Sequence, residues 1–219
     1  MDYASFLTKV SIAAIPILLA ITLHEVAHGR VARHFGDRTA EAQGRLSLNP
    51  LRHIDPIGTV VVPLVLLALS GFLFGWAKPV PVNPRFLRRP KQDMVYVAAA
   101  GPVANVLMAI AWAFALSFAQ HQAGSTPMVW LEAMAWVGVT INLLLAVFNM
   151  LPIPPLDGGR VLVNLLPPGP VSSALQRLEP WGLFIVLGLL MTGVLFMLLS
   201  GPLGVLKGLL LSLVGAKGY

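Results

Sequence analysis

The chain has 219 residues, of which 57% are hydrophobic and only 11% are charged, and its mean hydropathy is +0.79. A soluble globular domain carries about 25% charged residues, so this composition excludes an ordinary soluble domain and predicts a membrane protein. The absence of cysteine excludes disulfides, thiol catalysis and zinc ligation by cysteine. The net charge of +6 does not indicate nucleic-acid binding, because most basic residues lie beside apolar segments.

Apolar runs of membrane-spanning length recur along the chain. Because a helix of about 20 residues crosses a bilayer, each of these runs is long enough for a membrane span: residues 5–29, 57–76, 94–119, 129–151 and 181–216. The last run is long enough for two passes, and Gly201-Pro202 near its middle predicts the turn of a tight helical hairpin. The fold class is therefore an all-α polytopic membrane protein with five to six transmembrane helices.

We expect a single membrane-embedded domain over residues 1–219, with a core at about 5–165 and a C-terminal helical hairpin at about 181–216. Two extended stretches, Gly44–Asn49 and Trp76–Asn83, interrupt the helical pattern. The second contains Pro79 and Pro81, which disfavour helix and suit an edge strand or an extended surface segment. These stretches predict a small membrane-associated β or extended element.

The positions of the basic residues predict the topology. Arg30–Arg52 and Lys78–Lys91 contain five Lys or Arg each, whereas the loop between the third and fourth apolar runs has none. Positive loops stay in the cytoplasm, so both basic segments are expected there. They flank residues 57–76, which we therefore expect to form a re-entrant or hairpin element with break points at Pro63 and Gly71.

Residues His24–His28 read H-E-V-A-H within the first apolar run, where we expect a helix. A step of four residues brings His24 and His28 to one face, one turn apart, which suits two ligands of a tetrahedral zinc ion. Glu25 is then placed to act on water bound to that ion. Two histidines and a glutamate within hydrocarbon are costly and typical of a functional site, so this segment predicts a zinc centre.

A zinc centre needs a third protein ligand, and the residues alone leave several candidates: His34, His53, His121, Asp37, Asp55, Asp157, Glu41 and Glu132. His34 has the spacing found in metzincins, but on a continuing helix its side chain points away from the other two histidines. Asp157 is favoured because three prolines break the chain just before it. Broken backbone at membrane depth must line a cavity or be buried in protein, where a carboxylate can point inward. The alternative is that Asp157 only caps the next helical turn.

Three segments together resemble the site-2 protease family of intramembrane metalloproteases (peptidase M50 type): His24–His28, Gly101–Asn105 and Asn149–Gly159. The resemblance spans roughly residues 10–165 and is to the compact subgroup without a PDZ domain. It implies that His24, His28 and Asp157 bind one zinc ion and that Glu25 is the catalytic base. It also implies a substrate-binding role for Asn149 and, more weakly, for Asn105, with interhelical hydrogen bonding or helix packing as the alternatives.

The resemblance implies a zinc-dependent endopeptidase that cleaves transmembrane segments of membrane proteins, in regulated intramembrane proteolysis. Its partners would be transmembrane protein substrates and the lipid bilayer, and the sequence does not define an oligomeric state. We expect a multi-pass protein of a bacterial-type plasma (inner) membrane, with the active site towards the cytoplasmic side. The alternatives are a membrane metal transporter or channel that uses the same His and Asp ligands, and an inactive scaffold of protease ancestry. Glu25 beside His24 favours the enzyme, because transport does not require it.

Overall fold

The structure, a computed structural model, describes residues 3–62, 65, 78–122 and 124–218. In these ranges the chain is mostly helical and no strand is present, which confirms the predicted all-α fold class. The elements are α1 (Tyr3–His34), α2 (Thr39–Ala42), η1 (Pro50–His53), η2 (Pro56–Val61), η3 (Pro84–Phe86), α4 (Pro90–His121), α5 (Thr126–Asn149), α6 (Asp157–Leu165), α7 (Pro170–Leu178), η4 (Glu179–Trp181), α8 (Gly182–Met191) and α9 (Val194–Leu213).

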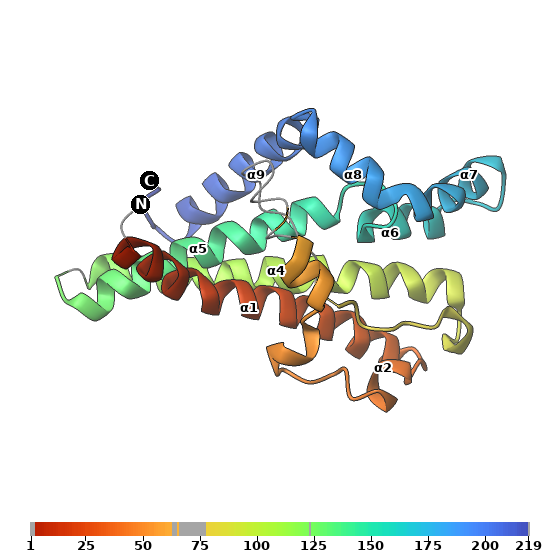
Figure 1. The fold of residues 1–219 in the computed structure, drawn as a ribbon, viewed down its shortest axis with the longest axis horizontal. Coiled ribbons are helices and arrows are strands. Elements are labelled where there is room, and N and C mark those ends of the chain that lie inside the picture. The colour runs from red at the N-terminus through yellow and green to blue at the C-terminus, as the bar shows by residue number, and fades with distance from the viewer. Residues whose placement is uncertain (1–2, 63–64, 66–77, 123, 219) are drawn as a thin grey trace.

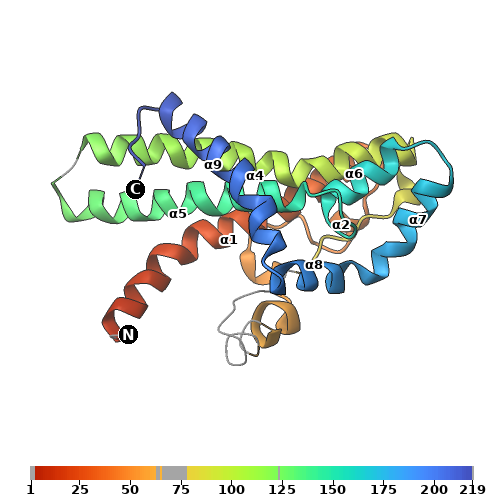
Figure 2. The same ribbon diagram turned by 90° about the horizontal axis from the view of Figure 1, so that it is seen from above.

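Five helical segments of the described chain are long and apolar enough to cross a membrane: Leu7–His34, Pro90–His121, Thr126–Asn149, Pro170–Met191 and Val194–Leu213. The protein is therefore a multi-pass membrane protein. Helices α1, α4 and α5 pack against one another and form the centre of the molecule (Figure 1, Figure 2). The α4–α5 contact includes the fully buried Ala109, Ala113 and Ala135. Such small side chains let helix backbones approach closely, which supports helix association in lipid.

The central helices alternate in direction. The C-terminal end of α1, the N-terminal end of α4 and the C-terminal end of α5 therefore lie together, on the side of α6 and α7 (Figure 1). Two basic segments lie at this same end: Arg30–Arg52 begins in the last turns of α1, and Lys78–Lys91 runs into the first turn of α4. The Lys78 amide donates to the carbonyl oxygen of His53 at 2.9 Å, so the chain leaves and re-enters this region at one point. The re-entrant prediction for residues 57–76 falls mostly outside the described residues and stays a prediction.

The C-terminal hairpin differs from its prediction in the place of the turn. We expected the turn at Gly201-Pro202, but α8 ends at Met191, α9 begins at Val194, and Pro202 lies inside α9. Gly193 makes the turn because it adopts a φ of 74°, which a residue without a Cβ reaches at no steric cost. Proline is tolerated within α9 because membrane helices accommodate the missing backbone donor through neighbouring groups.

Of the two predicted forms, a β or an extended element, the described residues contain the extended form and no strand. Gly44 has a φ of 63° in a turn, so Gly44–Asn49 does not begin as an extended strand. Residues 78–83 have no regular secondary structure and run as an extended segment beside the central helices (Figure 1). This segment is fixed by hydrogen bonds from its backbone to side chains of other elements, which take the place of a β-ladder.

Candidate metal centre

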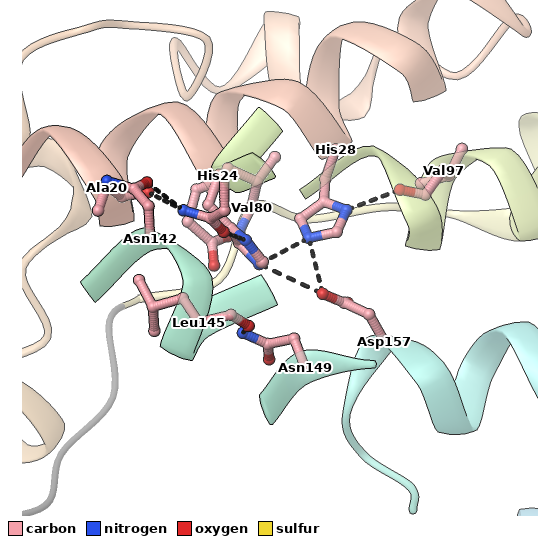
Figure 3. Close-up of polar contacts among 11 residues, drawn as sticks. Ala20, His24, His28, Val80, Val97, Asn142, Leu145, Asn149 and Asp157 are labelled. Carbon is pink, nitrogen blue, oxygen red and sulfur yellow. Dashed lines mark hydrogen bonds and ion pairs between the residues drawn. The ribbon is translucent and has the colours of Figure 1, made fainter. Parts of the chain in front are cut away.

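Three side chains from distant parts of the chain meet inside the bundle (Figure 3). His24 and His28 lie one turn apart on α1, and Asp157 is the first residue of α6. The two Nε2 atoms are 3.0 Å apart, and each lies 3.3 Å from Oδ2 of Asp157. All three residues are largely buried, and the described residues contain no other group of His, Asp or Glu arranged to hold a metal ion.

Asp157 reaches the histidines because the chain turns sharply between α5 and α6. The turn includes Pro152, Pro154 and Pro155, after α5 has ended at Asn149. Gly158 and Gly159 allow the start of α6 to lie against this turn: a Cβ on Gly158 would be 2.3 Å from the Met150 carbonyl oxygen, and one on Gly159 would be 2.4 Å from the Pro154 nitrogen. The two glycines therefore set the position of the carboxylate.

One face of α4 supports both histidines. Val97, Gly101 and Asn105 are spaced by four residues, so they share a face of the helix. Nδ1 of His28 lies 2.7 Å from the Val97 carbonyl oxygen, and Nδ1 of His24 lies 2.6 Å from Oδ1 of Asn105. Gly101 sits between them. A Cβ at Gly101 would lie 2.4 Å from His28 Nε2 and 2.5 Å from His24 Cε1, so only glycine leaves the nitrogens accessible.

The donor set fits a metal ion. A carbonyl oxygen only accepts, so a neutral His28 carries its proton on Nδ1 and turns the lone pair of Nε2 towards Asp157. Oδ2 of Asp157 is buried and has no hydrogen bond within the described structure. An orphaned carboxylate oxygen that faces an imidazole lone pair is unfavourable unless a cation lies between them. Two imidazole nitrogens and one carboxylate oxygen are ligands typical of a catalytic zinc site.

Glu25 follows His24 on α1 and faces the extended segment of residues 78–83. Its Oε2 accepts a hydrogen bond from the Val80 amide at 2.7 Å. The buried Arg45 fixes the residues just before Val80, because its Nη2 donates to the Lys78 carbonyl oxygen at 2.7 Å and to that of Pro79 at 3.3 Å. The Asn83 amide donates to the buried Asp37 carboxylate at 2.7 Å. Glu25 is thus oriented by a segment that is itself held at both ends.

The other candidate ligands lie outside this cluster. His34 ends α1 and packs against Phe35, and Asp55 caps η2. The remaining ones have partners elsewhere: His53 with Ser47, Asp37 with Thr39 and Asn83, Glu41 with Arg33 and Arg38, His121 with Ser117, and Glu132 with Gln120. The structure therefore brings together three of the predicted site residues, His24, His28 and Asp157, and none of the alternatives.

The two asparagines singled out in the sequence lie in different surroundings. Asn105 is fully buried and contacts His24, and its substrate-binding role stays a prediction. Asn149 is half-buried at the end of α5, and its Nδ2 donates to the Leu145 carbonyl oxygen of the same helix at 3.0 Å (Figure 3). Sequence reasoning missed Asn142, a fully buried amide on α5 that contacts Asn105. An asparagine in the middle of an apolar run was the available signal.

Comparison with known proteins identifies the family. The "Putative zinc metalloprotease YwhC" of Bacillus subtilis is 41% identical to the chain over 182 residues, which cover 81% of this chain and 79% of the relative. The chain belongs to peptidase family M50. The family model, Peptidase family M50, matches residues 118–199. No solved structure matches the chain.

More distant relatives carry similar names. The "Putative zinc metalloprotease Rip2" of Mycolicibacterium smegmatis is 32% identical over 181 residues, covering 80% of this chain and 64% of the relative. The "Putative zinc metalloprotease MJ0611" of Methanocaldococcus jannaschii is 30% identical over 154 residues, covering 69% of each. The protein is an M50 member with five candidate membrane helices among its described residues, so it is a membrane zinc metalloprotease, and the transporter alternative is not supported.

Proposed function

We propose that this M50 protease is an endopeptidase that cleaves transmembrane segments of other membrane proteins within the bilayer. In this proposal His24, His28 and Asp157 bind one zinc ion and Glu25 is the catalytic base. The observation that carries it is the convergence of these three ligand atoms within 3.0–3.3 Å of one another. Two of them come from α1, which is long and apolar enough to span a membrane, and the third comes from the start of α6.

The depth of the centre supports cleavage within the bilayer. Candidate span Leu7–His34 ends six residues after His28 and ten residues after His24. At about 1.5 Å per residue, the histidines lie roughly 9–15 Å from the end of the span. The hydrocarbon core is about 30 Å thick, so the centre lies below the membrane surface. We place it nearer the cytoplasmic face of a bacterial-type plasma membrane, because the basic segments lie at this end.

The proposed chemistry divides into metal and protein contributions. Zinc, when bound, supplies Lewis acidity that activates water and polarises the peptide carbonyl. His24, His28 and Asp157 fix its position. Glu25 keeps Oε2 on the Val80 amide, which leaves Oε1 to take the proton of the attacking water. The same carboxyl group then passes this proton to the leaving amine as the peptide C–N bond breaks, so Glu25 ends the cycle unchanged.

The extended segment of residues 78–83 offers a binding site for an unwound substrate. A transmembrane helix hides its carbonyl groups in hydrogen bonds, so the scissile region must unwind and be held extended. Residues 79–82 line a groove of about 650 Å³ together with α6 and α7, which continue from the Asp157 side of the centre. An unwound substrate can lie along this groove by backbone pairing, a mode that tolerates varied sequences.

Replacement of Glu25 by glutamine tests the proposed function. An amide cannot accept the proton of water, so Glu25→Gln should lower proteolysis by more than about 10²-fold while zinc content and fold are retained. Quantitative membrane proteomics of cells that carry either form should reveal single-pass proteins that accumulate uncleaved in the variant. Purified candidates are then incubated with both forms in detergent or vesicles. Equal cleavage by the Glu25→Gln form would exclude Glu25 as the base.

A further inference from the structure

We infer that Asn105 and Asn142 are positioning residues that fix the protonation pattern and orientation of His24, so that Nε2 is the atom that faces the metal. This inference rests on the proposed role of His24 as a zinc ligand. It assigns to two buried amides of α4 and α5 a role separate from substrate binding. It also separates Asn105 from Asn149, although both lie in the segments that carry the family resemblance.

A continuous chain of hydrogen bonds links three helices behind His24. Nδ1 of His24 lies 2.6 Å from Oδ1 of Asn105. Nδ2 of Asn105 donates to the Ala20 carbonyl oxygen at 3.2 Å and to Oδ1 of Asn142 at 2.9 Å. Nδ2 of Asn142 donates to the Gly138 carbonyl oxygen at 2.9 Å. Asn105 and Asn142 are fully buried, so no solvent competes with these bonds.

The donor and acceptor of every hydrogen bond in this network follow from the carbonyl oxygens at its two ends. Backbone carbonyl oxygens only accept, so the amide atoms that face Ala20 and Gly138 must be the NH₂ groups of Asn105 and Asn142. The amide oxygen of Asn105 is then left to face His24 and must accept. Nδ1 of His24 therefore carries the proton, and the lone pair lies on Nε2, the atom 3.3 Å from Asp157 Oδ2. The assignment does not depend on a free choice of amide flip or imidazole tautomer.

The two histidines have the same tautomer, with the proton on Nδ1, but different hydrogen-bond partners fix it. His28 donates Nδ1–H to the Val97 carbonyl oxygen, which no side-chain substitution removes. His24 depends on a side chain, and that side chain depends in part on Asn142. Removal of a residue that hydrogen-bonds to a metal-binding histidine typically lowers metal affinity by about 10- to 100-fold. The binding of zinc by His24 can therefore be weakened by a substitution at a residue that does not contact the metal.

Zinc affinity, measured by competition with a chelator of known affinity, tests the inference without reference to proteolysis. Asn105→Leu should bind zinc about 10- to 100-fold more weakly than the wild type. Asn142→Leu should show a smaller loss, because Asn105 keeps its bond to Ala20. Asn105→Asp is the partial rescue variant: it keeps an oxygen towards His24 but no longer donates to Ala20 and Asn142, so it should bind zinc more tightly than Asn105→Leu and more weakly than the wild type. Asn149→Leu is the matched control, because its amide bonds only within α5, and its zinc affinity should equal that of the wild type.

The outcomes separate this inference from the proposed function. Wild-type zinc affinity in Asn105→Leu, or an equal loss in Asn149→Leu, would overturn it. Wild-type affinity in Asn142→Leu would remove Asn142 from the assignment. If Asn105→Leu does not fold, Asn142→Leu and Asn105→Asp still decide, since the inference requires the first to be weakened and the second to retain binding. His24→Ala is measured alongside: unchanged zinc affinity in that variant would contradict the ligand set itself.

Discussion

At the residue scale, the centre depends on what α4 places in front of the histidines. Val97 offers a carbonyl oxygen, Gly101 offers no side chain and Asn105 offers an amide, at three successive turns of one face. Each has a separate effect on the ligand nitrogens: two fix the rings and one leaves space. Helix packing is one explanation of Gly101 and Asn105 in the sequence, and the structure adds that both lie against the ligand histidines.

Substitution of the proposed ligands should change zinc stoichiometry. Asp157→Ala and His28→Ala should each reduce bound zinc well below one ion per chain, because two remaining ligands hold the metal poorly. His34→Ala should retain one ion, since His34 packs against Phe35 outside the cluster. Elemental analysis of the purified proteins gives the stoichiometry. Full zinc content in Asp157→Ala, together with loss in His34→Ala, would show that the ligand assignment is wrong.

Gly101→Ala should abolish metal binding although it adds only a methyl group. Its Cβ would lie 2.4 Å from His28 Nε2, in the space that the metal needs, so we expect zinc loss and at least a 10²-fold loss of proteolysis. Gly204→Ala is the matched control: it lies within α9, and a Cβ there would meet no atom within 4 Å. Elemental analysis and thermal unfolding of both variants check the prediction. Normal zinc content in Gly101→Ala would contradict the proposed metal position.

The sequence predicts residues of the centre unequally well. His24, Glu25 and His28 are predictable because a helix makes a four-residue spacing a spatial relation. Asp157 is predictable as the favoured one of several candidates because of the prolines before it, but its approach to the histidines depends on the turn that Gly158 and Gly159 permit. Asn142 is not predictable as a contact of the centre, because its bond to Asn105 requires knowledge of how α4 packs on α5.

At the scale of elements, helix boundaries follow from the few residues that can adopt unusual backbone angles. The long apolar runs predict α1, α4, α5 and the terminal hairpin, because spanning length is a property of local composition. The sequence prediction places the turn between α8 and α9 wrongly, because the Gly201-Pro202 pair and the lone Gly193 are both local turn signals. Packing decides between them: α8 and α9 meet through Val186, Leu195 and Leu199, which a turn at Gly193 allows.

The extended segment of residues 78–83 shows how one element orients another. Its backbone is bound by Arg45 near one end, Glu25 in the middle and Asp37 at the other end. The sequence predicts Arg45 only as one of several topology-determining charges. Its burial shows that its guanidinium is also a structural link, because a buried cation needs the carbonyl oxygens that it contacts.

Arg45→Met should therefore impair proteolysis without removing zinc. Loss of the bonds to Lys78 and Pro79 frees the segment that holds Glu25, and a displacement of about 1 Å can lower the rate about 10²-fold. Zinc content should stay at one ion, because no ligand contacts Arg45. Arg85→Met, which removes an exposed charge from the neighbouring segment, should keep wild-type activity. Proteolysis assays with elemental analysis measure both effects, and full activity in Arg45→Met would exclude this role.

At the scale of the whole molecule, the metal centre and the charges constrain the topology independently. Zinc ligation would require the ends of α1 and α5 to lie on one side, and α4 and α5 supply the two crossings between them. The basic residues on both sides of residues 57–76 predict that those flanks lie together in the cytoplasm. The hydrogen bond between the Lys78 amide and the His53 carbonyl oxygen agrees with both arguments. Hydropathy alone predicts a full crossing for residues 57–76, so topology needs the additional constraints.

Cysteine labelling in this cysteine-free chain tests that topology. Single cysteines at Arg52 and Arg85, both exposed, should react with an impermeant thiol reagent only from the cytoplasmic side of oriented membranes. A cysteine at Gln122, in the loop at the opposite end of α4, should react only from outside. Labelling of Arg52→Cys and Arg85→Cys from opposite sides would mean that residues 57–76 cross the membrane and would contradict the re-entrant prediction. Labelling of both only from outside would place the metal centre towards the exterior.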